Sequence, residues 1–155
     1  MRKKRNYKRD HKPDLKYNSV AVERLINYIM QDGKKDIARK VVFDAFEIIK
    51  KNTKQEPLVI FQKALENATP SVEVASKRVG GANYQVPREV RAERKFMLAV
   101  RWIIGAARSQ KGKPIAEKLA NEIMAASKNE GSAIKKKLDT HRMAEANRAF
   151  AHFSW

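Results

Sequence analysis

Apolar residues recur every three or four positions along most of the chain, a spacing that places them on one face of an α-helix. After Ser19, a residue type that caps helix N-termini, Val22, Leu25 and Ile29 follow this spacing, and Gly33 is placed to end the helix. The same spacing predicts five more helices, over residues 36–49, 57–69, 91–109, 114–129 and 132 to near the C-terminus. The chain is therefore expected to be mainly helical.

The apolar pattern changes from helical to alternating between the third and fourth predicted helices. Residues 72–79 and 83–87 each alternate apolar and polar side chains, as β-strands do. Gly80 and Gly81 lie between them and suit a turn that needs positive φ, and Pro87 is expected to close the second strand. Because two isolated strands are only marginally stable in water, we expect a protruding hairpin that a partner completes.

The length of the chain, 155 residues, suits about one domain, and its 43% of hydrophobic residues suffices for a core. The expected fold is a single mainly α domain of about six helices over residues 19–155, with a β-hairpin at about 72–87 between the third and fourth helices. Residues 1–18 are expected to form a basic, extended N-terminal arm, whose first sixteen residues carry eight Lys or Arg against two Asp. Tyr7 among these bases favours stacking on nucleic acid, with a solvated tail as the alternative.

The net charge indicates a polyanionic partner. The chain has 34 Lys and Arg against 17 Asp and Glu, a formal charge of +17, whereas solubility needs only about 2 to 8. A membrane surface is the alternative polyanion, but the sequence contains no long apolar segment, signal-peptide core or lipidation motif. We therefore expect a nucleic-acid partner, with no membrane and no small-molecule substrate.

Few residue types for catalysis are present. The chain has no Cys, which excludes disulfides, thiolate zinc sites and cysteine nucleophiles and fits a reducing cytoplasm. His141 and Glu145 have the one-turn spacing of metal ligands, but no third ligand is recognisable. Gly80 and Gly81 lack the following Lys-Ser/Thr of a phosphate loop. We expect no metal, no cofactor and no catalysis, with an RNA-processing activity at His141 and Glu145 as the enzymatic alternative.

The basic residues fall in several separated clusters instead of on one helix. They lie at residues 34–35, 77–78, 88–95, 111–113 and 135–137. Dispersed Lys and Arg on a rigid helical scaffold suit phosphate and 2′-hydroxyl contacts with structured RNA, whereas a reader of duplex DNA concentrates its base contacts on one recognition helix. Structured RNA is the expected partner, and a DNA-binding architectural or regulatory protein is the alternative from another class.

Four segments carry a resemblance to a known family: LINYIMQDGKKDIARKVVFDAFEII, ALENATPSVEVASKRVGGANYQVPREVRAERK, MLAVRWIIGAAR and HRMAEANRAFAHFSW. In this order they cover nearly the whole chain, and they resemble bacterial-type small-subunit ribosomal protein seven. The resemblance implies a six-helix domain with a protruding hairpin in a structural, non-catalytic protein of the small ribosomal subunit. It further implies primary binding to the 3′ major domain of the ribosomal RNA, nucleation of subunit-head assembly, and a place near the exit-site tRNA and the messenger path.

The resemblance also implies partners and contact residues. The implied partners are small-subunit ribosomal RNA, exit-site tRNA, messenger RNA and ribosomal proteins nine and eleven of the small subunit, in the cytoplasm of a bacterium or in an organelle. Together with the basic pattern, it gives as RNA-binding candidates Arg2, Lys3, Lys4, Arg5, Lys8, Arg9, Lys34, Lys35, Lys77, Arg78, Gly80, Gly81, Tyr84, Arg91, Arg94, Lys95, Arg101, Lys136, Arg142 and Arg148.

The predicted hairpin departs from the family pattern at two positions. Ala75 stands where relatives often carry a base, and Arg88 stands where an aliphatic residue is usual, so charge has moved toward the exit of the hairpin. Lys77 and Arg78 are expected to point at RNA. Tyr84 is expected either to stack on a base or to brace the hairpin, and bracing is favoured.

Overall fold

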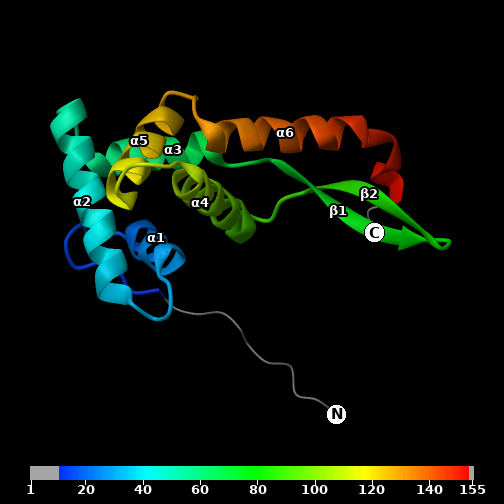
Figure 1. The fold of residues 1–155 in the computed structure, drawn as a ribbon. Coiled ribbons are helices and arrows are strands. Elements are labelled where there is room, and N and C mark those ends of the chain that lie inside the picture. The colour runs from blue at the N-terminus through cyan, green and yellow to red at the C-terminus, as the bar shows by residue number, and fades with distance from the viewer. Residues whose placement is uncertain (1–10, 154–155) are drawn as a thin grey trace, which may run out of the picture.

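The computed structural model describes residues 11–153, which form six α-helices, one 3₁₀-helix and a two-stranded antiparallel sheet. The elements follow in the order α1 (Val20–Ile29), α2 (Lys35–Thr53), α3 (Pro57–Ala68), β1 (Val72–Val79), β2 (Ala82–Glu89), α4 (Ala92–Ser109), α5 (Ile115–Ser127), α6 (Ser132–Ala146) and η1 (Arg148–Phe153). Figure 1 shows the helices gathered into one body, from which the β1–β2 hairpin extends to one side with α6 running alongside it. The predicted mainly α fold with a hairpin between the third and fourth helices is confirmed.

The core lies where α5 packs against α2, α3 and α4. Phe46 of α2, Phe61 of α3 and Ile103 of α4 are fully buried there together with Ile123 of α5. The rings of Phe46 and Phe61 meet with 5.6 Å between their centroids, within the range of attractive aromatic pairs. Phe61, Ile103 and Ile123 belong to the apolar faces that helical spacing predicts, whereas Phe46 is a core residue that the predicted face of the second helix did not include. None of the helices among residues 11–153 is long and apolar enough to cross a membrane.

Helix α1 begins at the predicted place but ends earlier than predicted. Ser19 occupies the N-cap position with extended backbone, yet its side chain makes no capping hydrogen bond. Met30 leaves the helical region at φ −52° and ψ 137°, so the helix stops at Ile29. The prediction that Gly33 ends this helix is wrong, because Gly33 lies in the following loop, where its φ of +74° serves the turn into α2.

The last helix is also shorter than predicted. Helix α6 ends at Ala146, and Asn147 caps it, its backbone N–H and side-chain amide both donating to the carbonyl oxygen of Met143. The chain continues as the tighter 3₁₀-helix η1, which packs against β2. Because a 3₁₀ turn redirects the chain, the C-terminal segment lies beside the hairpin instead of extending α6, as Figure 1 shows.

The two strands of the hairpin pair in one continuous register, from Val72 opposite Glu89 to Val79 opposite Ala82. Gly80 and Gly81 form the turn with φ of +57° and +89°, the positive values that the adjacent glycines predict. The prediction that Pro87 closes the second strand is wrong, because β2 runs on to Glu89. A two-stranded ribbon leaves one edge of each strand unpaired, and a proline without an N–H is tolerated on such an edge.

Alternate residues of the hairpin lie on opposite faces. On one face Glu73 and Val86 are buried and Tyr84 is half-buried, with its ring against those of Phe150 and Phe153 in η1. Helix α6 also contacts both strands. On the other face Arg78 and Gln85 are exposed. The expectation that a partner completes the hairpin is wrong in this respect, because the C-terminal segment of the same chain supplies the packing.

The end of the predicted N-terminal arm contacts the helical body. Residues 1–10 lie outside the described part of the chain, as do residues 154–155. Asp14 is only 3% exposed, and one of its carboxylate oxygens accepts the backbone N–H groups of Lys16 and Tyr17. The ring of Tyr17 packs edge-on against Phe43 and Phe46 of α2. Packing on the body therefore begins before residue 19.

Candidate nucleic-acid interface

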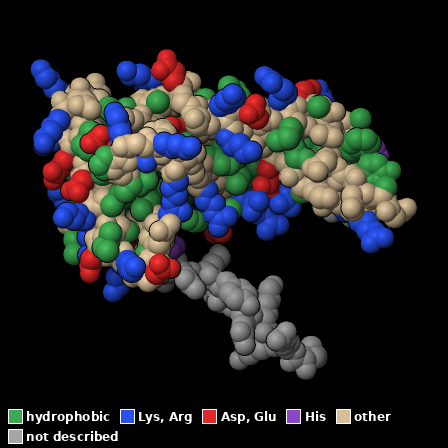
Figure 2. All heavy atoms as spheres, in the orientation of Figure 1, with side chains coloured by type: hydrophobic (Ala, Val, Ile, Leu, Met, Phe, Trp, Pro, Cys, Tyr) green, Lys and Arg blue, Asp and Glu red, His purple; other side chains and the backbone are tan. Residues whose placement is uncertain are grey.

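Basic side chains are spread over several elements of the surface. Figure 2 shows Lys and Arg across the visible face, with a group along its lower edge beneath α4 and the base of the hairpin. Within residues 11–153 the predicted candidates come from the α1–α2 loop, the hairpin, α4 with its N-cap, and the C-terminal α6 and η1. The arm candidates Arg2, Lys3, Lys4, Arg5, Lys8 and Arg9 lie outside the described residues.

Lys34 and Lys35 are adjacent at the start of α2, but their side chains have different environments. Lys34 is exposed in the loop. Lys35 begins α2, and its ammonium forms an ion pair with the largely buried carboxylate of Glu23 on α1. Lys34 therefore presents its charge to solvent, whereas the charge of Lys35 is partly neutralised by a contact that joins the two helices.

Lys77 and Arg78 also differ in their environments, because consecutive residues of a strand lie on opposite faces of the hairpin. Lys77 lies on the packed face, and its Nζ donates a hydrogen bond to the carbonyl oxygen of Phe153 at 2.8 Å. Arg78 lies on the opposite, exposed face, two residues before the Gly80–Gly81 turn. Of this predicted pair, Arg78 is the residue that the hairpin presents outward.

An aromatic cluster joins the outer half of the hairpin to the C-terminal segment. The Tyr84 ring centroid lies 5.3 Å from that of Phe150 and 5.3 Å from that of Phe153. Both phenylalanines belong to η1, so the 3₁₀-helix places their rings under the strand. The contacts are those that the bracing interpretation of Tyr84 predicts.

Glu73 connects the two strands of the hairpin to α4. One of its oxygens accepts hydrogen bonds from Arg88, directly across the ladder on β2, with Nε at 2.8 Å and Nη2 at 2.7 Å. The other accepts from Nε of Arg94 on the first turns of α4 at 2.6 Å. Burial alone would raise the pKa of Glu73, but Arg94 and Arg88 outweigh it and lower the pKa below its usual value.

Helix α4 carries the largest group of predicted candidates. Arg91 at its N-cap is exposed, as are Arg94 and Arg101, while Lys95 is half-buried. The guanidinium carbon of Arg101 lies 5.8 Å from the ring centroid of Tyr28 on α1, a weak cation–π contact.

Arg24 of α1 was not among the candidates predicted from the sequence. Its guanidinium carbon lies 3.9 Å from the ring centroid of Phe96 on α4, beside the contact between Arg101 and Tyr28. In the sequence, Arg24 and Tyr28 stand one helical turn apart, which places them on the same face of α1. Only the fold shows that this face lies against α4. Arg24 thus adds a cation to the seam between α1 and α4.

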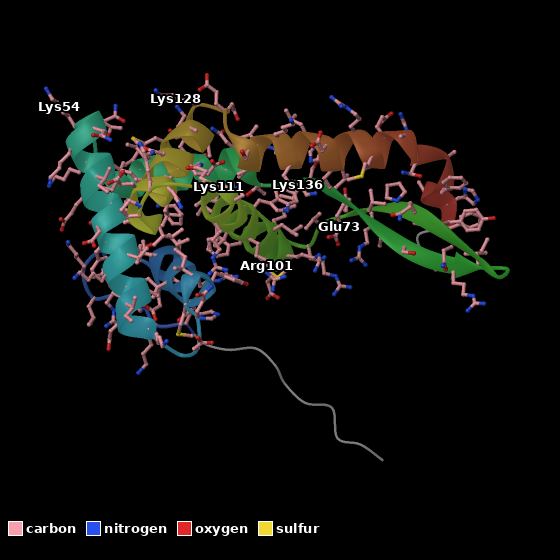
Figure 3. The ribbon with its side chains drawn as sticks, in the orientation of Figure 1. Lys54, Glu73, Arg101, Lys111, Lys128 and Lys136 are labelled. Atoms are coloured by element: carbon pink, nitrogen blue, oxygen red, sulfur yellow. The ribbon has the colours of Figure 1, made fainter. Side chains whose placement is uncertain are left out.

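Lys136, Arg142 and Arg148 come from the C-terminal part of the chain and are all exposed. Figure 3 shows Lys136 in the middle of the molecule, where α4, α6 and the base of the hairpin come together. Arg142 and Arg148 line a groove of about 650 Å³ between the hairpin base and α6, together with Arg88. Arg148 also contacts Glu145, 3.3 Å away on the surface, a contact of little energetic weight.

Comparison with known proteins assigns the chain to a family. The family model described as ribosomal protein S7p/S5e matches residues 1–148. The chain belongs to this family. It is 58% identical over 155 residues to the small ribosomal subunit protein uS7 of Thermotoga neapolitana, and 57% identical over 155 residues to that of Thermotoga maritima, covering 100% of each chain in both cases. It is also 57% identical over 147 residues to the uS7 of Dictyoglomus thermophilum, covering 95% of this chain and 94% of that protein.

Members of the S7p/S5e family are structural ribosomal proteins and not enzymes. In this chain His141 makes a contact between two elements of the fold. Its Nε2 accepts the backbone N–H of Ser71, just before β1, at 3.2 Å. Burial lowers the pKa of His141, and the nearby ammonium of Lys137 lowers it further, which keeps the ring neutral and able to accept. Among residues 11–153 no three His, Asp or Glu side chains come together as a metal site. His141 therefore connects α6 to the start of the hairpin.

Proposed function

We propose that this S7p/S5e family member is a component of the small ribosomal subunit that binds the 3′ major domain of the ribosomal RNA and nucleates assembly of the subunit head. The observation that carries the proposal is the distribution of exposed cations over separate elements of the fold. Arg91 and Arg101 lie along α4, Arg78 lies on the hairpin, and Lys136 and Arg142 lie on α6. Such a distribution suits recognition of a folded RNA by shape and phosphate contacts.

The candidates are ranked by the exposure of their side chains. The exposed candidates are the strongest: Lys34, Arg78, Arg91, Arg94, Arg101, Lys136, Arg142 and Arg148. Lys35 and Lys77 are only half-exposed and make contacts within the protein, so they support the surface more than they extend it. Gly80 and Gly81 would let the RNA backbone approach the turn closely, because they carry no side chain. The arm bases complete the proposed set.

The hairpin is proposed to lie beside the exit-site tRNA and the messenger path, and ribosomal proteins nine and eleven are proposed neighbours. Among the described residues, the hairpin and its packed C-terminal segment extend furthest from the helical body in Figure 1. A braced extension can reach a second RNA while the body stays bound to the first. The cytoplasm, or an organelle with its own ribosomes, is the proposed location.

The experiment that tests the proposal is a binding titration across a salt series. The full chain would be titrated with a transcript of the 3′ major domain and with duplex DNA of equal length. We expect the transcript to stay bound at ~0.2 M salt after the duplex has dissociated, because shape-specific contacts persist when counterion release weakens. Equal retention of both would contradict the proposal and favour a general polyanion binder.

Assembly is tested separately by reconstitution. Small-subunit proteins added to the ribosomal RNA with and without this chain are expected to differ in the head alone. Occupancy of head proteins that is independent of this chain would contradict the proposed nucleating role, even if RNA binding holds.

A further inference from the structure

We infer that Glu73 is a positioning residue that holds Arg88 and Arg94 together as one phosphate-binding site at the base of the hairpin. The inference rests on the proposed function, which supplies the RNA, and it joins the candidate Arg94 to Glu73 and Arg88, which are not among the RNA-binding candidates predicted from the sequence. Figure 3 shows Glu73 where the hairpin leaves the helical body, beside α4.

The three side chains differ sharply in burial. The Glu73 side chain is only 9% exposed, whereas those of Arg88 and Arg94 are 51% and 44% exposed. A buried carboxylate with both oxygens occupied has little freedom to move, so the two guanidiniums that it binds are held from within. Their outer edges remain open to solvent. The guanidiniums of Arg88 and Arg94 are thus held in place by the buried carboxylate of Glu73.

The donors that remain are suited to a phosphate. Arg88 directs its Nε and Nη2 to one oxygen of Glu73, and Arg94 directs its Nε to the other. A guanidinium has five N–H donors in a planar fork, so each arginine keeps donors that point away from the carboxylate. Two guanidiniums fixed in this way have already lost the rotamer freedom that a flexible arginine loses on binding. Glu73 therefore preorganises the site.

The position of the site connects two parts of the proposed RNA surface. Arg88 also lines the groove between the hairpin base and α6, and Arg94 lies one turn after the exposed Arg91 at the start of α4. An RNA backbone that crosses from α4 to the hairpin would pass over both guanidiniums. The chemical class of the ligand is thus the phosphodiester backbone of RNA.

Replacing Glu73 with Gln separates positioning from simple electrostatics. The change removes a negative charge near the RNA, so electrostatics alone predicts tighter binding. Positioning predicts the opposite: Glu73→Gln weakens binding of the 3′ major domain transcript about tenfold, the loss expected when charge-assisted contacts are no longer held in place. The matched control is Glu89→Gln on the same strand, since Glu89 is exposed and forms no ion pair among residues 11–153. This control is expected to bind the transcript as tightly as the wild type or more tightly.

A second variant separates positioning from a purely structural role. Arg94→Lys keeps a cation that can pair with Glu73 but removes the fork of donors, so a structural role predicts unchanged RNA affinity and the proposed site predicts weaker binding. NMR of the arginine side chains supplies an independent signature, because slowly exchanging Nε–H signals of Arg88 and Arg94 in the free wild type should be lost in Glu73→Gln.

The outcomes distinguish this inference from the proposed function. If the wild type fails to prefer the transcript over duplex DNA, the proposed function fails. If the wild type shows the preference but Glu73→Gln behaves as Glu89→Gln does, the positioning role is overturned. Should Glu73→Gln not fold, as judged by its thermal transition, Arg94→Lys decides alone, and wild-type affinity in that variant overturns the site.

Discussion

Tyr84 on the hairpin and Phe153 near the C-terminus pack their rings with 5.3 Å between the centroids, although they are far apart in the sequence. This contact, with Phe150 beside it, makes the hairpin and the C-terminal segment one structural unit. A two-stranded ribbon needs packing of this kind to be stable in water. The shape of the outer part of the described molecule therefore depends on η1.

Replacing Tyr84 tests the aromatic brace. Tyr84→Ala is expected to lower the free energy of unfolding by about 2 kcal/mol, because it removes a partly buried ring and two aromatic contacts. Tyr84→Phe keeps the ring and is expected to stay within about 0.5 kcal/mol of the wild type. Urea unfolding followed by circular dichroism measures both. Unchanged stability of Tyr84→Ala with lost RNA affinity would instead support stacking of Tyr84 on a base.

The opposite faces of Lys77 and Arg78 predict different effects for two adjacent substitutions. Arg78→Ala is expected to weaken RNA binding by about 1 kcal/mol and to reduce the salt slope by about 1, with stability unchanged. Lys77→Ala is expected to lower the free energy of unfolding by about 1 kcal/mol, because the hydrogen bond from Nζ of Lys77 to the Phe153 carbonyl oxygen is lost. Salt-dependent RNA titration and urea unfolding of the two variants check the difference. Identical behaviour of the two variants in both measurements would contradict the assigned faces.

A substitution at Gly131 tests the tight packing between α5 and α6. Its φ is +94°, and a Cβ added there would lie 2.9 Å from a carboxylate oxygen of the buried Glu122, which binds the backbone N–H of Ala133. Gly131→Ala is expected to cost about 1–3 kcal/mol through backbone strain and displacement of this carboxylate.

Gly112→Ala is the matched control for Gly131→Ala. Gly112 has a similar φ of +87°, but a Cβ there would have nothing within 4 Å. This variant is expected to show the backbone strain alone, so its thermal transition should lie between those of the wild type and Gly131→Ala. Equal losses would mean that the Glu122 contact contributes nothing.

The lowered pKa of His141 predicts that the free energy of unfolding depends on pH. Because its pKa is lowered in the fold, the unfolded chain binds a proton more readily than the folded chain does. The stabilisation from neutral His141 is therefore complete above its ordinary pKa of about 6.5 and is lost as the pH falls through the lower pKa of the folded state. His141→Ala is expected to be about 1 kcal/mol less stable than the wild type at pH 8, and this difference is expected to shrink toward pH 5.

Urea unfolding of wild type and His141→Ala at pH 8, 6.5 and 5 measures this effect. RNA affinity at neutral pH is expected to be the same in both proteins, because the neutral His141 ring carries no charge for a phosphate and its Nε2 already accepts the Ser71 N–H. A stability difference that stays constant or grows on acidification would contradict the prediction.

The sequence by itself determined the helical body. Residues such as Leu25, Val42 and Ile103 repeat at helical spacing, and each is buried on the face that this spacing defines. The turn at Gly80 and Gly81 and the alternation of the strands were equally predictable, because both depend on local backbone preferences. The total charge likewise indicated an anionic partner before any fold was known.

Only the tertiary structure decided which charges face outward. The pairing of Glu73 with Arg88 and Arg94 depends on strand register and on the approach of α4 to the hairpin. The hydrophobic periodicity of a single segment predicts neither. The turn of the C-terminal segment onto the hairpin set Lys77 and Tyr84 inward and left Arg78 outward. Local preferences act over a few residues, whereas the assignment of a cation to an ion pair or to solvent is set by contacts between segments far apart in the chain.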